Sequence, residues 1–128
     1  MSEPNKAIKI ASTPKPNGPY SQAIVAGNMI FTSGIGASWP IRGAMDEGIE
    51  EQTRHVLRTI DTLLREHGSS LKDVVKATVH LQHIHRDFDG FSRTYAEFFT
   101  EPYPVRTTLD GQLQNILVEI DVIAVRQG

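Results

Sequence analysis

The sequence predicts an α+β domain in which two helices pack on one face of a mixed β-sheet. Short strand-like segments, two of them separated by residues typical of a hairpin turn, occupy the first third of the chain. Helical and strand-like segments alternate after it. A length of 128 residues suits one domain of ordinary size, whereas two domains would each bury too little core. We therefore expect a single domain over residues 1–128.

The N-terminal part predicts an edge strand, an irregular loop and a hairpin. Strand-like residues lie at 8–10, and three prolines and a glycine within 13–20 predict a stiff loop. Apolar runs at 23–26 and 29–32 flank Gly27-Asn28, which can connect two strands directly. Residues 33–36 should end the second strand, and 39–46 should form a loop that includes Trp39.

The remainder predicts two amphipathic helices and three strands. Apolar residues recur at helical spacing from Ile49, and Gly68 should end that helix. A second helix should carry Phe91, Tyr95, Phe98 and Phe99, with Asp87 or Asp89 as its N-cap. Strands are expected at 74–81, 105–109 and 116–125.

The final strand suggests that the chain associates with copies of itself. It is apolar at nearly every position, which is typical of a strand buried on both faces. Two helices can cover only one face of the sheet. We therefore expect a homo-oligomer in which the other faces of the sheets meet.

Composition narrows the class of protein. The net charge of -2 disfavours nucleic acid as a partner, because affinity for phosphate comes from Lys and Arg. The absence of cysteine excludes disulfides and thiolate chemistry. No secretory signal or membrane-spanning run is evident, so we expect a cytoplasmic protein without a membrane partner.

Several blocks resemble the RidA/YjgF family in order and spacing, over about residues 8–125. They are Gly-Pro-Tyr-Ser-Gln-Ala at 18–23, Gly-Asn-Met-Ile-Phe-Thr-Ser-Gly at 27–34, Glu-Glu-Gln-Thr-Arg at 50–54, Gly-Ser-Ser-Leu-Lys-Asp-Val-Val-Lys at 68–76, Tyr-Ala-Glu-Phe-Phe at 95–99, Glu-Pro-Tyr-Pro-Val-Arg-Thr-Thr at 101–108 and Val-Glu-Ile at 118–120.

The resemblance implies a chorismate-mutase-like fold and a homotrimer with active sites in the clefts between subunits. It also implies hydrolysis of 2-imino acids, such as iminopropanoate or iminobutanoate, to 2-oxo acids and ammonia. The small 2-imino or 2-oxo acid would be the ligand, and no metal or organic cofactor is implied.

Arg106 and Glu119 are the candidate catalytic residues. An arginine can hold a carboxylate through two parallel hydrogen bonds, and Arg106 matches the family's substrate arginine. Glu119 interrupts an apolar strand, and in the resembling enzymes this glutamate serves the attacking water. We expect both side chains to converge on one anion-sized cleft. The alternatives are a surface arginine paired with an acid and a structural or solvent-facing glutamate.

Further residues match family positions at the substrate. Gly34 and Thr108 would contact the carboxylate through their backbone, and Tyr20 would line the pocket from across the subunit interface. Ser33 is a candidate polar contact. Ser92 stands where many relatives have Asn, and Thr108 where many have Cys. The segment 109–115 is about two residues shorter than in common relatives and adds Asp110, which leaves the substrate range open.

Other patterns are weaker. His80, His83 and His85 invite a metal interpretation, but His80 and His83 should point to opposite faces of a regular strand, so surface or edge histidines are favoured. Besides the imine deaminase, two hypotheses stay open: a non-catalytic regulatory or RNA-directed trimer, and a pathway-specific deaminase acting on another enamine or carbamate.

Overall fold

The computed structural model describes residues 4–8, 18–37 and 47–127. The expected loop at 39–46, including Trp39, and the proline-rich residues 13–17 lie outside the described residues.

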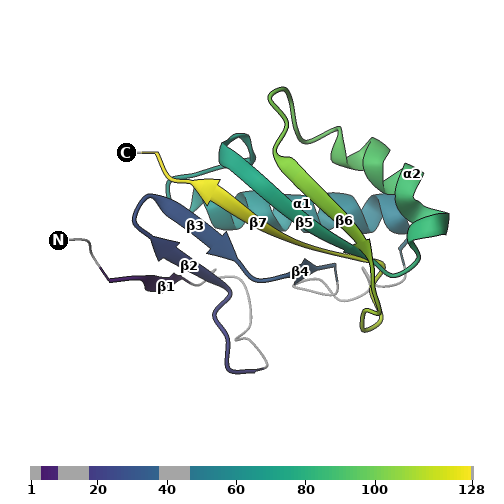
Figure 1. Cartoon of the computed structure of the whole chain (residues 1–128), viewed down its shortest axis with the longest axis horizontal. Helices are drawn as coiled ribbons and strands as arrows, with labels where there is room; N and C mark the ends of the chain where they lie inside the picture. Colours follow the sequence, from purple (N-terminus) through teal and green to yellow (C-terminus); the bar gives the residue numbers. More distant parts are fainter. Residues whose placement is uncertain (1–3, 9–17, 38–46, 128) are drawn as a thin grey trace.

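A seven-stranded mixed sheet forms the frame of the molecule (Figure 1). Its order is β1-β2-β3-β7-β5-β6, and β4 also pairs with β7. The β5–β6 pair is parallel and every other pair is antiparallel. The strands are β1 Lys6–Ile8, β2 Ala23–Ala26, β3 Met29–Thr32, β4 Ile35–Gly36, β5 Val74–Leu81, β6 Val105–Asp110 and β7 Val118–Val125.

Two helices, α1 Ile49–Arg65 and α2 Ile84–Tyr95, cover one face of this sheet (Figure 1). A short 3-10 turn, η2 Leu71–Asp73, leads into β5. The predicted α+β class, with a mixed sheet and both helices on one side, is thus confirmed. None of the described helices is long and apolar enough to cross a bilayer.

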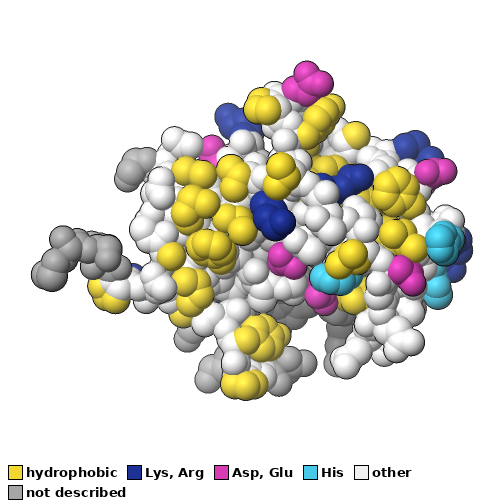
Figure 2. Space-filling model, viewed as in Figure 1, with side chains coloured by type: hydrophobic (Ala, Val, Ile, Leu, Met, Phe, Trp, Pro, Cys, Tyr) yellow, Lys and Arg dark blue, Asp and Glu magenta, His cyan; other side chains and the backbone are white. Residues whose placement is uncertain are grey.

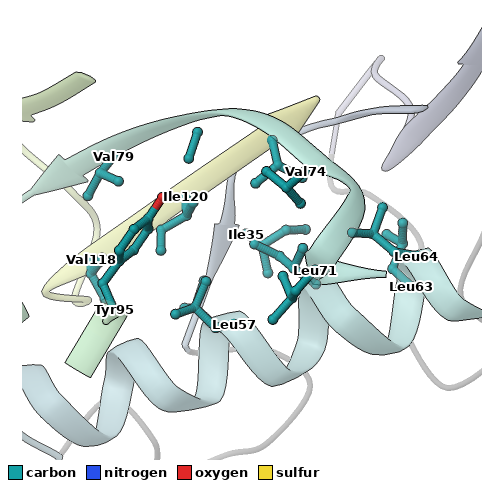
Figure 3. Packing of buried hydrophobic residues seen from close by; sticks show 14 of the residues in the cluster. Ile35, Leu57, Leu63, Leu64, Leu71, Val74, Val79, Tyr95, Val118 and Ile120 are labelled. Carbon is teal, nitrogen blue, oxygen red and sulfur yellow. The ribbon is translucent and has the colours of Figure 1, made fainter. Parts of the chain in front are cut away.

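The hydrophobic core lies between α1 and the covered face of the sheet (Figure 3). Leu57, Leu63 and Leu64 of α1 point toward the sheet, with Leu57 on the side of Val118 and Ile120 of β7, and all five are almost fully buried. Burying one such side chain contributes roughly 1.5–3 kcal/mol. This packing fixes β7 from one side.

Several predicted elements agree with the structure because their signals are local. Strands β2 and β3 have the predicted bounds, and Gly27 in the turn between them has a positive φ of 61°, which suits glycine. Helix α1 ends before Gly68, whose φ is 80°. Strand β5 also has its predicted bounds.

Other boundaries were wrong. The first strand, Lys6–Ile8, starts before the predicted 8–10, of which residues 9–10 lie outside the described part of the chain, and β7 begins at Val118 rather than 116. Residues 35–36 form the short strand β4, which the sequence suggested only as the end of a strand. Helix α2 ends at Tyr95, so Phe98 and Phe99 follow it in a turn.

Neither Asp87 nor Asp89 caps α2, contrary to the prediction. The N-cap position is His83, whose side chain makes no cap hydrogen bond. The backbone N–H of Ile84 instead donates to Asp110 Oδ1 at 3.1 Å. The helix therefore takes a carboxylate partner from the end of β6, and Asp87 is buried in the first turn beside Arg86.

Strand β7 presents two different faces. Its residues at 118, 120, 122 and 124 are buried against the helices, and the alternate ones are only half-buried. The face away from the helices carries Glu119 and Asp121 and is called the open face below. Within one chain β7 is therefore buried on one face only, whereas the sequence predicted burial on both faces.

Candidate active site

Arg106 lies on the helix side of β6, which is an edge strand of the sheet. Its guanidinium carbon stands 4.7 Å from the ring centroid of Tyr95, 5.3 Å from Phe91 and 5.8 Å from Phe88. Its Nη2 donates a hydrogen bond of 3.2 Å to Ser92 Oγ. Positions 88, 91, 92 and 95 share one face of a helix, so one side of α2 forms the whole support. We call these four residues and Arg106 the arginine wall.

The arginine wall leaves the charge of Arg106 without an acid. Aromatic faces attract a cation, yet they leave most guanidinium N–H groups ready to donate. In the described part of the chain no carboxylate lies within ion-pair distance of this side chain, so an arginine paired with a surface acid is not what the structure shows. The arrangement suits capture of an external anion.

A contact between the helices helps to hold α2 in place. Arg54 of α1 donates to Glu97, just beyond α2, through Nε at 3.1 Å and Nη2 at 3.0 Å, and it also contacts Glu51. These hydrogen bonds lower the pKa of Glu97 and raise that of Arg54. A two-pronged contact of this kind restricts the orientation of the helix end.

Glu119 stands on the open face beside the backbone of Gly34. A Cβ at Gly34 would overlap the Glu119 carboxylate and its neighbouring carbons, so only glycine leaves room for this side chain. Glu119 is half-buried. Gly34 and Glu119, which were both predicted as site residues, therefore lie side by side.

A β-bulge brings Gly34 to this place. Phe31 pairs with Ile123, and Ile35 pairs with Ile120, so the strand passing over β7 carries one residue more than β7 does. Thr32 Oγ1 accepts a hydrogen bond of 3.0 Å from Val122 N–H within the irregular stretch. The chain leaves the regular ladder at Ser33 and Gly34, beside the Glu119 side chain.

Gln52 fixes the start of β7 from inside the core. This fully buried amide accepts from Leu117 N–H at 2.8 Å and donates to the Glu47 carbonyl at 2.7 Å. Leu117 is two residues before Glu119. The position of Glu119 is therefore held by α1 as well as by the sheet.

The two catalytic candidates do not converge within one chain. In β5, Ala77 pairs with Arg106 and His80 pairs with Glu119. Residues three apart on a strand point to opposite faces, and directly paired residues share a face. Arg106 therefore faces the helices and Glu119 the open face. Within the single chain, the expected convergence of the two side chains on one cleft is not found.

Three of the four remaining candidates lie at one of these two places. Thr108, two residues after Arg106, lies on the same face, and Ser92 contacts Arg106 directly. Ser33 precedes Gly34 and is half-buried. Tyr20 precedes β2 and is 52% exposed.

Groups that titrate surround Glu119. His80 lies directly opposite it, and Asp121 is the next residue of β7 on that face. Burial raises the pKa of Asp121, while His80 and Lys76 partly offset this increase. Among the described residues no three His, Cys, Asp or Glu side chains are placed to hold a metal ion; His83 and His85 are exposed.

The open face combines an apolar area with a charged one. Figure 2 shows hydrophobic side chains gathered over β2, β3 and the end of β7, with basic, acidic and histidine side chains beside them. Phe31, in the apolar area, is 42% exposed. Apolar surface of this kind is typical of an interaction site.

Comparisons with known proteins place the chain in a family. Residues 10–126 match the family model described as Endoribonuclease L-PSP, and the chain belongs to this family, which includes the RidA, YjgF and RutC proteins. A RutC family protein of Pyrococcus abyssi is 41% identical over 125 residues, covering 95% of this chain and 98% of its own.

A protein named 2-iminobutanoate/2-iminopropanoate deaminase, from Salmonella typhimurium, is 33% identical and covers 96% of this chain and 99% of its own. The crystal structure of a Rid family protein from Yersinia pestis superposes with a TM-score of 0.81 at 32% identity, over 95% and 99% of the two chains. These findings confirm the family resemblance.

Sequence reasoning missed two parts of the site. Phe91 and Tyr95 were predicted only as residues of an amphipathic helix and Phe88 was not singled out, although helical spacing places all three on one face with Ser92. His80 was considered only as a metal ligand or surface residue. Pairing of β5 with β7 would have placed it opposite Glu119, but that pairing is not local.

Proposed function

We propose that the protein is a hydrolytic deaminase of small 2-imino acids, with each active site shared between two copies of the chain. The observation that carries the proposal is the separation of Arg106 and Glu119 on opposite faces of one sheet. The family match and the deaminase relative support the reaction class. The homotrimer implied by the resemblance would supply the second copy.

In this proposal the arginine wall of one copy meets the open face of another. The wall occupies the edge strand β6, where it is accessible, and the open face carries exposed apolar surface that a second copy could cover. Neither half would be complete alone. The proposal therefore links assembly to activity.

The chemistry assigns one task to each group. Arg106 would hold the substrate carboxylate with two parallel N–H donors, while Ser92 and the aromatic rings keep its plane fixed. The Glu119 carboxylate would take a proton from water as the oxygen bonds to the imine carbon. The proton passes to nitrogen, the C–N bond breaks, and R–C(=NH)–COO⁻ plus water gives R–CO–COO⁻ plus NH₃.

The activity is tested by competition for a short-lived imine. An amino-acid oxidase acting on alanine supplies 2-iminopropanoate, semicarbazide traps it, and the deaminase should reduce semicarbazone formation. Arg106→Ala and Glu119→Gln should each lose about 100-fold or more in kcat/KM. No effect of the wild-type protein on trapping excludes this function.

The shared site is tested by mixing the two inactive variants. After co-expression at equal levels, about a quarter of random contacts pair an intact Arg106 with an intact Glu119, so about a quarter of wild-type activity should return. Each variant alone is the control. If the wild type is active and the mixture of the two variants is not, the shared site is rejected but the deaminase function still stands.

The family's description favours one second candidate, cleavage of RNA. The net charge of -2 gives little general attraction to phosphate. Incubation with a short single-stranded RNA at low ionic strength separates the two functions. RNA cleavage would replace deamination as the proposed function if two results are obtained. The wild type cleaves the RNA and Glu119→Gln does not, and the wild type has no effect on semicarbazone formation.

A further inference from the structure

His80 is a histidine of the open face that the proposed reaction does not use. Its Nδ1 is buried and, among the described residues, has no hydrogen-bond partner. A buried polar atom is normally paired, so an unpaired one calls for an explanation such as a bound group absent from the single chain. Gly111, where the chain leaves β6, lies against the ring, since a Cβ there would be 3.7 Å from His80 Cδ2.

The sheet places this ring across from two carboxylates of the neighbouring strand. Glu119 is its direct partner across the β5–β7 ladder, and Asp121 is the diagonal neighbour on the same face. Direct partners have Cβ atoms about 4.5–5.5 Å apart, and diagonal neighbours remain within reach of long side chains. An imidazole at this position can interact with both acids.

Apart from the two acids of β7, the charged residue nearest to His80 on the open face comes from its own strand and not from β6. On its own strand Lys76 is the next charged residue of the open face and lies diagonal to Asp121. On β6 the residue paired with His80 is Leu109, while Asp110 points to the helix side. The described charged groups that face the ring are thus Glu119 and Asp121, with Lys76 beyond them.

We propose that His80 is a positioning residue of the Glu119 site, whose imidazolium stands opposite Glu119 and diagonal to Asp121 and offsets their charge toward an anionic substrate. This inference rests on the proposed function for its effect on activity. When His80 is protonated, the three groups carry a net charge of -1, since two carboxylates and one imidazolium are present. When it loses the proton, the substrate carboxylate meets a charge of -2 and binds less well.

The coupling to Asp121 supports this placement independently of catalysis. Burial raises the pKa of Asp121, and His80 is the first of the two cations that counteract the increase. The interaction is reciprocal, because a charge that favours an ionised Asp121 is itself favoured by it. Removing the Asp121 charge should therefore alter the surroundings of the His80 ring.

The kinetic test compares pH profiles of His80→Gln and the wild type. The variant should lose about tenfold in kcat/KM at pH 6, mostly through KM, and the deficit should shrink toward alkaline pH, where histidines in general are neutral. His80→Lys should restore the value at pH 6 and keep it at pH 9. The matched control is His85→Gln, which removes an exposed histidine of α2.

The direct test follows the histidine ring signals by NMR during a pH titration. The His80 signal is identified by its absence in His80→Gln, and Asp121→Asn should displace it while leaving the signal of the exposed His85 unchanged. Parallel pH profiles of wild type and His80→Gln, or an unchanged His80 signal in Asp121→Asn, overturn the inference. If the wild type has no deaminase activity, the proposed function fails, and the NMR result still decides the placement of His80.

Discussion

The surroundings of Arg106 and of Glu119 differ in their physics. Arg106 is supported by three aromatic rings and a hydroxyl, none of which changes charge near neutral pH, and every contact comes from its own chain. Glu119 stands on an open sheet face beside a glycine backbone, a histidine and a second acid. The Arg106 side chain is thus held in place within a single chain, whereas Glu119 lies on an uncovered face of the described structure.

This difference suggests a division of labour. A fixed positive group supported by neutral rings suits binding, because its geometry and charge stay constant. Acids and an imidazole in a partly solvated setting suit proton transfer, because small changes in environment shift their charge. Within one chain the sheet keeps the two halves apart, and in the proposed assembly a second copy would bring them together.

The largest expected effect comes from Gly34→Ala, which affects only the Glu119 half. The added methyl overlaps the Glu119 carboxylate, so that side chain must move. A displacement of about 1 Å at a reacting group can cost about 100-fold, and we expect a loss of that size in kcat/KM in the semicarbazone assay. Gly48→Ala is the control, because no atom lies within 4 Å of the added methyl there.

Mixing experiments sharpen this result. Co-expression of Gly34→Ala chains with Arg106→Ala chains should recover activity, because the two substitutions affect different faces of the sheet. Co-expression of Gly34→Ala chains with Glu119→Gln chains should recover none, because both substitutions affect the open face. The reverse pattern would mean that Gly34 belongs with the arginine wall.

Arg106→Lys should have the next largest effect, confined to binding. A lysine keeps the charge but lacks the planar fork and stacks poorly on the rings, so we expect KM to rise about tenfold or more with a smaller change in kcat. Steady-state kinetics separates the two constants. Arg93→Lys, on the exposed side of α2, should behave as wild type. An equal fall in kcat alone would place Arg106 at the reacting atoms rather than at the carboxylate.

Asp110→Ala should weaken the arginine wall through the start of α2. The carboxylate accepts from Ile84 N–H at 3.1 Å, and loss of such a cap typically costs about 1 kcal/mol. Urea unfolding followed by circular dichroism measures this change. Asp89→Ala, at the other predicted cap position, should leave the free energy of unfolding within about 0.5 kcal/mol of wild type. Equal effects of the two substitutions would exclude a cap formed by Asp110.

The cap also shows where sequence reasoning reaches its limit. The hairpin around Gly27, helix α1 and strand β5 follow from periodicity and turn chemistry within a few residues of each element. The partner of the α2 N-terminus is 26 residues away in the sequence, which no local pattern reports. Asp87 and Asp89 were plausible only because they were near.

The relation of Arg106 to Glu119 depends on another nonlocal fact. Both flanking strands pair with β5, so the face of each side chain depends on which β5 residue lies opposite it. A shift of one residue in either register would have placed the two side chains on the same face. The identity of the candidate residues came from the family resemblance, but their separation required the structure.

Asp121→Asn should give the smallest effect, and it reports on the open face alone. Because burial raises the pKa of Asp121 in the folded chain, its ionised form costs stability at neutral pH, and this cost disappears as the pH falls below the ordinary range of an aspartate. The amide should therefore raise Tm by about one or two degrees at pH 7 and leave it unchanged near pH 3. Asp89→Asn, which is exposed, is the control.

A lower Tm of Asp121→Asn at pH 7 would mean that His80 and Lys76 outweigh burial at this site. A larger gain at high protein concentration than after dilution would indicate that a second copy covers this face, because added burial further penalises the charge.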